Sequence, residues 1–82
     1  MIGGEERRKL LAVRLCGERV LMRLDAIGVR RLTDLVGRDP WEVMHEVNVQ
    51  AGRTIWRPPL AIAALQNLVD AAEREASRTA AA

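Results

Sequence analysis

The stretch that decides the fold is Arg14–Val29, with the sequence RLCGERVLMRLDAIGV. Its apolar positions recur at helical spacing, at Leu21, Leu24 and Ile27. This spacing places the three side chains on one face and predicts a short amphipathic helix. Glycines flank that helix, with Gly17 at its entrance and Gly28 just past its exit. Glycine readily takes the left-handed backbone that ends a helix. The stretch therefore predicts a turn, a helix and a second turn.

Other helices are expected on both sides of this stretch. The clearest boundary is Asp39-Pro40-Trp41-Glu42, because Asp is a good N-cap, Pro suits the first helical position, and Glu three residues after the cap completes a capping box. Helical patterns extend over about residues 5–13, 18–27, 31–36, 40–51 and 59–77. Ile55 and Trp56 are too apolar for a solvent loop and are expected to cover the core. No segment alternates like a strand, so the sequence predicts an all-α fold of five helices.

Length and composition favour one small domain spanning residues 1–82, with residues 78–82 fraying at its end. Hydrophobic residues make up 49% of the chain and charged residues 29%, which argues against disorder. Cys16 is the only cysteine, so no disulfide can form within the chain. No apolar run is long enough to cross a membrane, and no signal-peptide pattern opens the chain. We therefore expect a cytoplasmic protein with no membrane contact.

Charge is distributed unevenly along the chain. Residues 1–31 hold eight Lys and Arg residues against four Asp and Glu, whereas residues 32–50 hold one against four. The basic excess therefore surrounds the opening stretch, where an acidic partner would bind. An ordinary solvated, arginine-rich surface is the alternative interpretation.

The residues that catalysis requires are scarce. His45 is the only histidine and Cys16 the only thiol, and no pattern orients one against the other. The spacing of metal ligands is missing, and so is a glycine-rich nucleotide loop. We therefore expect a non-catalytic protein without a metal, a cofactor or a small-molecule substrate.

The deciding stretch resembles the helix-hairpin-helix motif. The matching positions are Gly17, Leu21, Leu24, Gly28 and Val29. The resemblance continues through Leu32-Thr33-Asp34-Leu35, Asp39-Pro40, Val47-Asn48 and Pro58-Pro59, in the order found in small uncharacterised bacterial proteins that carry helix-hairpin-helix domains. It covers about residues 14–74 and implies a compact, SAM-like helical domain whose helix-hairpin-helix core spans about residues 5–36.

The resemblance also implies binding of a DNA or RNA backbone. In helix-hairpin-helix domains, backbone N–H groups at the start of the second helix hold a phosphate without reading sequence. Carried onto this chain, the donors are the backbone N–H groups around Cys16, Gly17, Glu18 and Arg19. The expected supporting charges are Arg14, Arg19, Arg23, Arg30 and Arg31. The sequence departs from the motif where Leu15 replaces the first hairpin glycine and where Glu18 adds negative charge, so a purely structural turn is the alternative.

A protein-interaction or homodimerisation module is the rival function, with the hairpin only as scaffold. The last helix carries a second face of small residues that would let another helix approach closely, and exposed apolar side chains elsewhere would anchor a partner. The predicted surface comprises Met22, Trp41, Leu60, Ala64, Asn67 and Ala71. The alternative interpretation is that the small-residue face reflects the high alanine content of the chain and not a binding surface.

Overall fold

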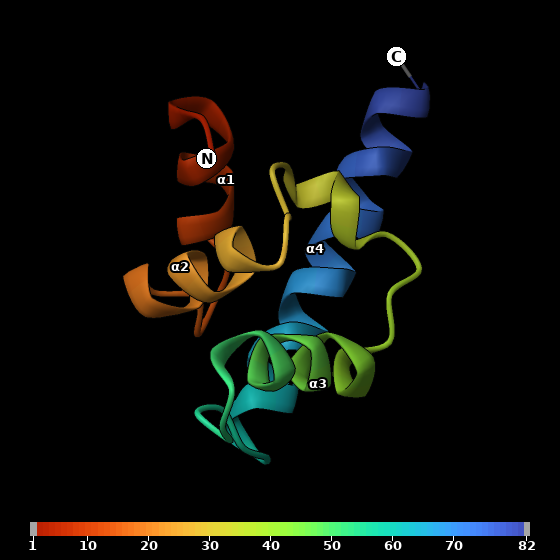
Figure 1. Ribbon diagram of the computed structural model, residues 1–82. Coiled ribbons are helices and arrows are strands. Elements are labelled where there is room, and N and C mark those ends of the chain that lie inside the picture. Colours follow the sequence, from red (N-terminus) through yellow and green to blue (C-terminus); the bar gives the residue numbers. More distant parts are fainter. Residues whose placement is uncertain (1, 82) are drawn as a thin grey trace.

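Four α-helices and one short 3₁₀-helix make up the fold (Figure 1). The computed structural model describes residues 2–81, and no strand occurs within that range. The elements are α1 (Gly4–Leu11), α2 (Glu18–Ala26), the 3₁₀-helix η1 (Leu32–Leu35), α3 (Pro40–Ala51) and α4 (Leu60–Ala81). The prediction of an all-α fold is confirmed.

The helix ends follow local signals in the sequence. Gly28 takes a φ of +92° just past α2, and the Val29 N–H donates to the Leu24 carbonyl at 3.0 Å. At the start of α3 the Asp39 side chain accepts the Trp41 N–H at 3.0 Å, as the predicted N-cap requires. Gly52 ends α3 in the left-handed conformation, with a φ of +76°.

Three of the predicted helices differ from the observed ones in length or type. The first helix ends at Leu11 rather than Val13, and the third is a 3₁₀-helix of four residues rather than an α-helix. The third segment begins only after the extended residue Arg31, and Gly37 follows it in the left-handed conformation, so a single short turn of helix fits between them. The last helix continues past Ser77 to Ala81, since no helix breaker follows Ser77. Ala82 lies outside the described residues.

The long helix α4 organises the packing. It runs the length of the molecule, with α3 against its first half and η1 against its second half, while α1 and α2 form the hairpin beside it (Figure 1). The core is aliphatic, and its side chains with no exposed surface include Leu10, Leu24, Leu35, Leu65 and Leu68. The Cα radius of gyration is 12.0 Å, close to the roughly 12 Å expected for a compact chain of this length.

Polar contacts also hold the fold together. Asn48, near the end of α3, fixes the loop that leads to α4: its Oδ1 accepts the N–H groups of Ile55 and Trp56 at 3.0 Å, and its Nδ2 donates to the Trp56 carbonyl at 2.9 Å. Trp56 is only 6% exposed and Ile55 is half-buried against the core. The expectation that these two residues cover the core is confirmed.

Two carboxylates hold η1 in place, Glu6 from α1 and Asp34 from η1 itself. Glu6 of α1 accepts the Leu32 N–H at 2.9 Å, and this hydrogen bond lowers the pKa of Glu6 below its usual value. Asp34 accepts the N–H groups of Arg30 and Arg31, each at 2.9 Å. These bonds, the one from Arg30 foremost, lower the pKa of Asp34 in the same way. Both carboxylates therefore stabilise the fold in their charged form.

This linkage predicts acid sensitivity. Because both folded-state pKa values are depressed, the contribution of Glu6 and Asp34 is complete above the unfolded-state values, at about pH 5 and higher, and is lost as the pH falls through the lower folded-state values. The double variant Glu6→Gln with Asp34→Asn should be less stable than the parent at pH 7. The two stabilities should converge in acid, as measured by urea unfolding at a series of pH values. A constant difference across that range would contradict the linkage.

Candidate nucleic-acid interface

The hairpin between α1 and α2 begins with an unusual backbone. Leu15 takes a φ of +70°, the only positive φ at a residue other than glycine among residues 2–81. Left-handed backbone disfavours a side chain by about 1–2 kcal/mol. Leu15 is the residue for which the resemblance to the helix-hairpin-helix motif predicts a glycine, and its side chain is 50% exposed rather than packed in the core. Its backbone conformation is therefore one that glycine would adopt without strain.

Cys16, the second hairpin residue, faces inward. Its side chain is buried, and burial raises the pKa of the thiol to about 11, so the thiol is protonated and unreactive at neutral pH. Its N–H donates to the Val13 carbonyl at 3.1 Å. The prediction that the Cys16 backbone supplies a phosphate donor is therefore wrong, because that N–H is already used within the turn.

Gly17 leaves the start of α2 open. Gly17 has no side chain that could accept a hydrogen bond from the first N–H groups of α2. A Cβ atom built on Gly17 would have no neighbouring heavy atom within 4 Å. The first N–H groups of a helix have no partner within it, so those that open α2 are free to bind an anion. Glu18 carries the nearest negative charge, and Arg7 of α1 pairs with both of its carboxylate oxygens. That ion pair offsets part of the repulsion that Glu18 would exert on a phosphate.

Of the five predicted arginines, two have a guanidinium that is free within residues 2–81 and three contact another side chain. Arg14 and Arg19 flank the hairpin, are exposed, and have no side-chain hydrogen bond or ion pair with any described residue. Arg23 is half-buried, and its guanidinium lies 5.2 Å from the centre of the Trp56 ring in a cation–π contact. Arg23 therefore links α2 to the loop before α4 instead of facing the hairpin with an open guanidinium.

Arg30 and Arg31 lie beyond the opposite end of α2. The nine residues of that helix separate them from Gly17 by roughly 13 Å along its axis. Arg30 donates to the Asp25 carboxylate at 2.7 Å, and Arg31 lies 3.9 Å from the Asp34 carboxylate. The structure therefore does not bring these two arginines to the hairpin, and the site narrows to Arg14, Gly17 and Arg19.

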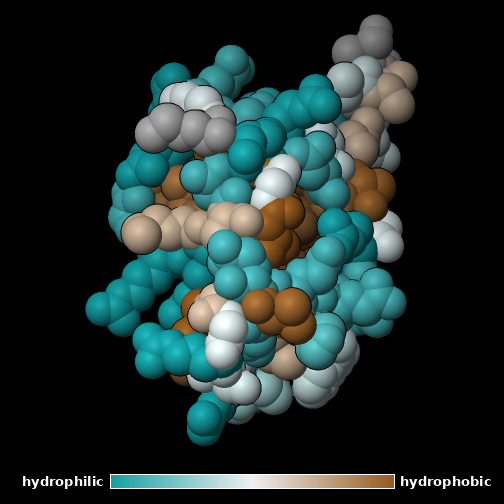
Figure 2. Space-filling view, in the orientation of Figure 1, coloured by the Kyte–Doolittle hydropathy of each residue, from teal (hydrophilic) through white to brown (hydrophobic). Residues whose placement is uncertain are grey.

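The predicted interaction surface is also divided. Ala64 is 3% exposed and Ala71 9%, and Asn67 between them donates to the Arg14 carbonyl at 3.0 Å. The expectation of an open small-residue face is wrong here, because the turn after α1 lies against it. Met22, Trp41 and Leu60 are at least half exposed but come from three different helices. On the face seen in Figure 2, apolar residues form separate groups within a mostly hydrophilic surface.

Sequence reasoning missed two parts of this site. The ion pair of Arg7 with Glu18 joins residues eleven positions apart, and no local pattern signals it. The left-handed backbone of Leu15 could have been inferred only from its alignment with the glycine of the motif.

Comparisons with protein-family models, with curated proteins and with solved structures gave no match to this chain. None of the described helices is long and apolar enough to cross a membrane. Residues 2–81 contain no group of three or more His, Cys, Asp and Glu side chains placed to hold a metal ion.

Proposed function

We propose that this chain is a non-catalytic helix-hairpin-helix module that binds the phosphate backbone of nucleic acid through its hairpin, without reading bases. The observation that carries the proposal is the φ of +70° at Leu15. The resemblance predicts a glycine at this position, so a left-handed backbone at Leu15 supports a hairpin of the motif's form in spite of the changed residue.

The open start of α2 supports the same proposal. Gly17 has free space around it, and the uncapped N–H groups after it combine with the positive end of the helix dipole. The unpaired guanidinium groups of Arg14 and Arg19 lie on either side of this position in the chain. Such a set of donors neutralises a phosphate but has no means of distinguishing base edges, which accounts for binding without sequence preference.

The arginines provide the first test, by fluorescence anisotropy with labelled duplex DNA. The double variant Arg14→Gln with Arg19→Gln should weaken binding about tenfold or more at low salt. It should also reduce the slope of log affinity against log salt by about 0.9 for each phosphate that the variant no longer neutralises. The matched control is Arg8→Gln with Arg53→Gln, which removes the same charge from exposed positions outside the turn and the start of α2. An equal loss in the two double variants would mean that only net charge matters, and the hairpin proposal would fail.

Restoring the glycine provides a test in the opposite direction. Leu15→Gly should raise duplex affinity about threefold to tenfold, because it removes the side chain beside the phosphate position and allows closer backbone approach. Leu15→Ala shortens the side chain but retains the strained backbone, so it should give a smaller gain. Unchanged affinity in Leu15→Gly, with the fold intact by circular dichroism, would argue against a phosphate at the hairpin.

A further inference from the structure

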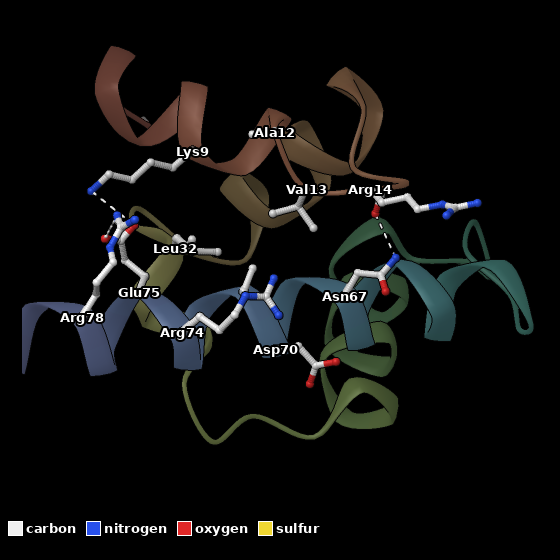
Figure 3. Close-up of a pocket in the computed structure, with 11 residues that line it drawn as sticks. Lys9, Ala12, Val13, Arg14, Leu32, Asn67, Asp70, Arg74, Glu75 and Arg78 are labelled. Carbon is white, nitrogen blue, oxygen red and sulfur yellow. Dashed lines mark hydrogen bonds and ion pairs between the residues drawn. The ribbon is translucent and has the colours of Figure 1, made fainter.

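A groove separates the first helix from the last and is distinct from the open start of α2. It lies between α1 with its following turn on one side and α4 on the other, and it encloses about 550 Å³ (Figure 3). Its floor is apolar, formed by Ala12 and Val13 from the first side, Leu32 of η1, and Ala71 of α4. Such a floor offers burial to an apolar side chain and offers no partner to a phosphate.

The groove carries more positive than negative charge. Four cations line it, Lys9, Arg14, Arg74 and Arg78, against two acids, Asp70 and Glu75. Glu75 is already shared, since it lies 3.9 Å from the Lys9 ammonium and accepts from Arg78 at 3.0 Å. Asp70 is exposed and accepts from Gln66 at 3.0 Å. The four cations therefore outnumber the two acids, and both acids already interact with other side chains of the chain.

Two guanidinium groups are left to bind an anionic occupant. Arg74 rises from α4 at the middle of the groove, and Arg14 lies at the end marked by Asn67 (Figure 3). Neither side chain has an ion pair or hydrogen bond with any residue that the structure describes. Unpaired cations above an apolar floor are complementary to carboxylates that flank an apolar side chain.

We propose that this groove binds a short acidic peptide segment of a partner protein, with an apolar side chain on the floor and carboxylates on Arg14 and Arg74. A nucleic-acid strand fits less well, because no aromatic side chain lines the groove to stack a base and the floor is not polar. The peptide site is independent of the proposed nucleic-acid function, although Arg14 belongs to both.

A random peptide library displayed on phage and selected against the purified protein would test this proposal. We expect enriched sequences to place Asp or Glu beside Leu, Ile or Phe. A fluorescein-labelled synthetic copy of an enriched peptide should bind the Arg74→Glu variant about tenfold more weakly than it binds the unmodified protein. A second peptide, in which Gln replaces every Asp and Glu, should bind the unmodified protein more weakly than the acidic peptide does. Ala12→Trp, which fills the groove from an exposed position, should also weaken binding. Arg8→Glu is the matched charge control and should bind as the parent does.

Several outcomes would overturn the proposal: no enrichment, enriched peptides without acidic residues, or peptide affinity that Arg74→Glu changes no more than Arg8→Glu does. If Ala12→Trp does not fold, the Arg74→Glu variant and the neutral peptide still decide the matter. Duplex DNA that displaces the peptide and shifts the amide resonances of Ala12 and Ala71 would assign the groove to nucleic acid instead. Failure of the nucleic-acid function is seen separately, because that function is measured as duplex binding by anisotropy and with Leu15→Gly, whereas the groove is tested by peptide binding and Arg74→Glu.

Discussion

Replacing Leu24 with alanine is expected to lower the free energy of unfolding by about 3 kcal/mol. Leu24 has no exposed surface, and its side chain packs into the core from the last turn of α2. Its carbonyl also accepts the N–H groups of Ile27 and Val29, so the turn after α2 is built directly on this residue. Truncation removes buried methyl groups and leaves a cavity that the surrounding helices can only partly fill.

A loss of this size is large for so small a chain, whose total stability is of the order of 4–12 kcal/mol. The midpoint of thermal unfolding should fall by roughly 12–24 °C, as followed by circular dichroism together with urea titration. Met22→Ala is the control on the same helix, since Met22 is 70% exposed and its truncation should change stability by less than about 0.5 kcal/mol. Similar losses in the two variants would show that α2 does not bury the face assigned to it.

Replacing Asn48 with alanine should lower stability by about 2–3 kcal/mol, although Asn48 is polar and only half-buried. The substitution removes three hydrogen bonds at once, those with the Ile55 N–H, the Trp56 N–H and the Trp56 carbonyl. Leaving partly buried backbone groups without partners is more destabilising than the loss of an average surface bond. The loop should loosen and the Trp56 ring should become more exposed.

Tryptophan fluorescence measures this exposure. In a Trp41→Phe background Trp56 is the only tryptophan, so its emission should shift to longer wavelength in Asn48→Ala before global unfolding. Gln50→Ala is the control, because Gln50 is exposed on the same helix, and it should leave both emission and stability nearly unchanged. Unshifted Trp56 emission in Asn48→Ala would mean that packing alone holds the loop.

The helix ends could be predicted because their signals are local. Asp39 caps α3 with its own side chain, and Gly28 and Gly52 stop α2 and α3 through their backbone freedom. Two other features depend on contacts between residues distant in sequence, so they could not be predicted from local patterns. Asn48 is seen as a loop organiser only once Trp56 lies beside it, and Glu6 as an anchor of η1 only once Leu32 does.

The candidate site shows the same division. Gly17 and Arg19 follow from the motif and from helical spacing, and the structure leaves both accessible. The prediction for the alanine face of α4 was wrong, because periodicity identifies a face of small residues but does not reveal whether this chain or another one covers it. The turn at Arg14 covers it here. Arginine pairing is unpredictable for a similar reason, since a long side chain can reach several acids.

An NMR titration of the ¹⁵N-labelled protein with a short duplex of arbitrary sequence tests the central claim most directly, since it observes the backbone N–H groups themselves. We expect the amide resonances of Gly17, Glu18 and Arg19 to shift as duplex is added, and added salt to reverse the shifts. Absence of shifts at these three residues under conditions where anisotropy reports binding, or shifts confined to α3 and α4, would contradict the claim.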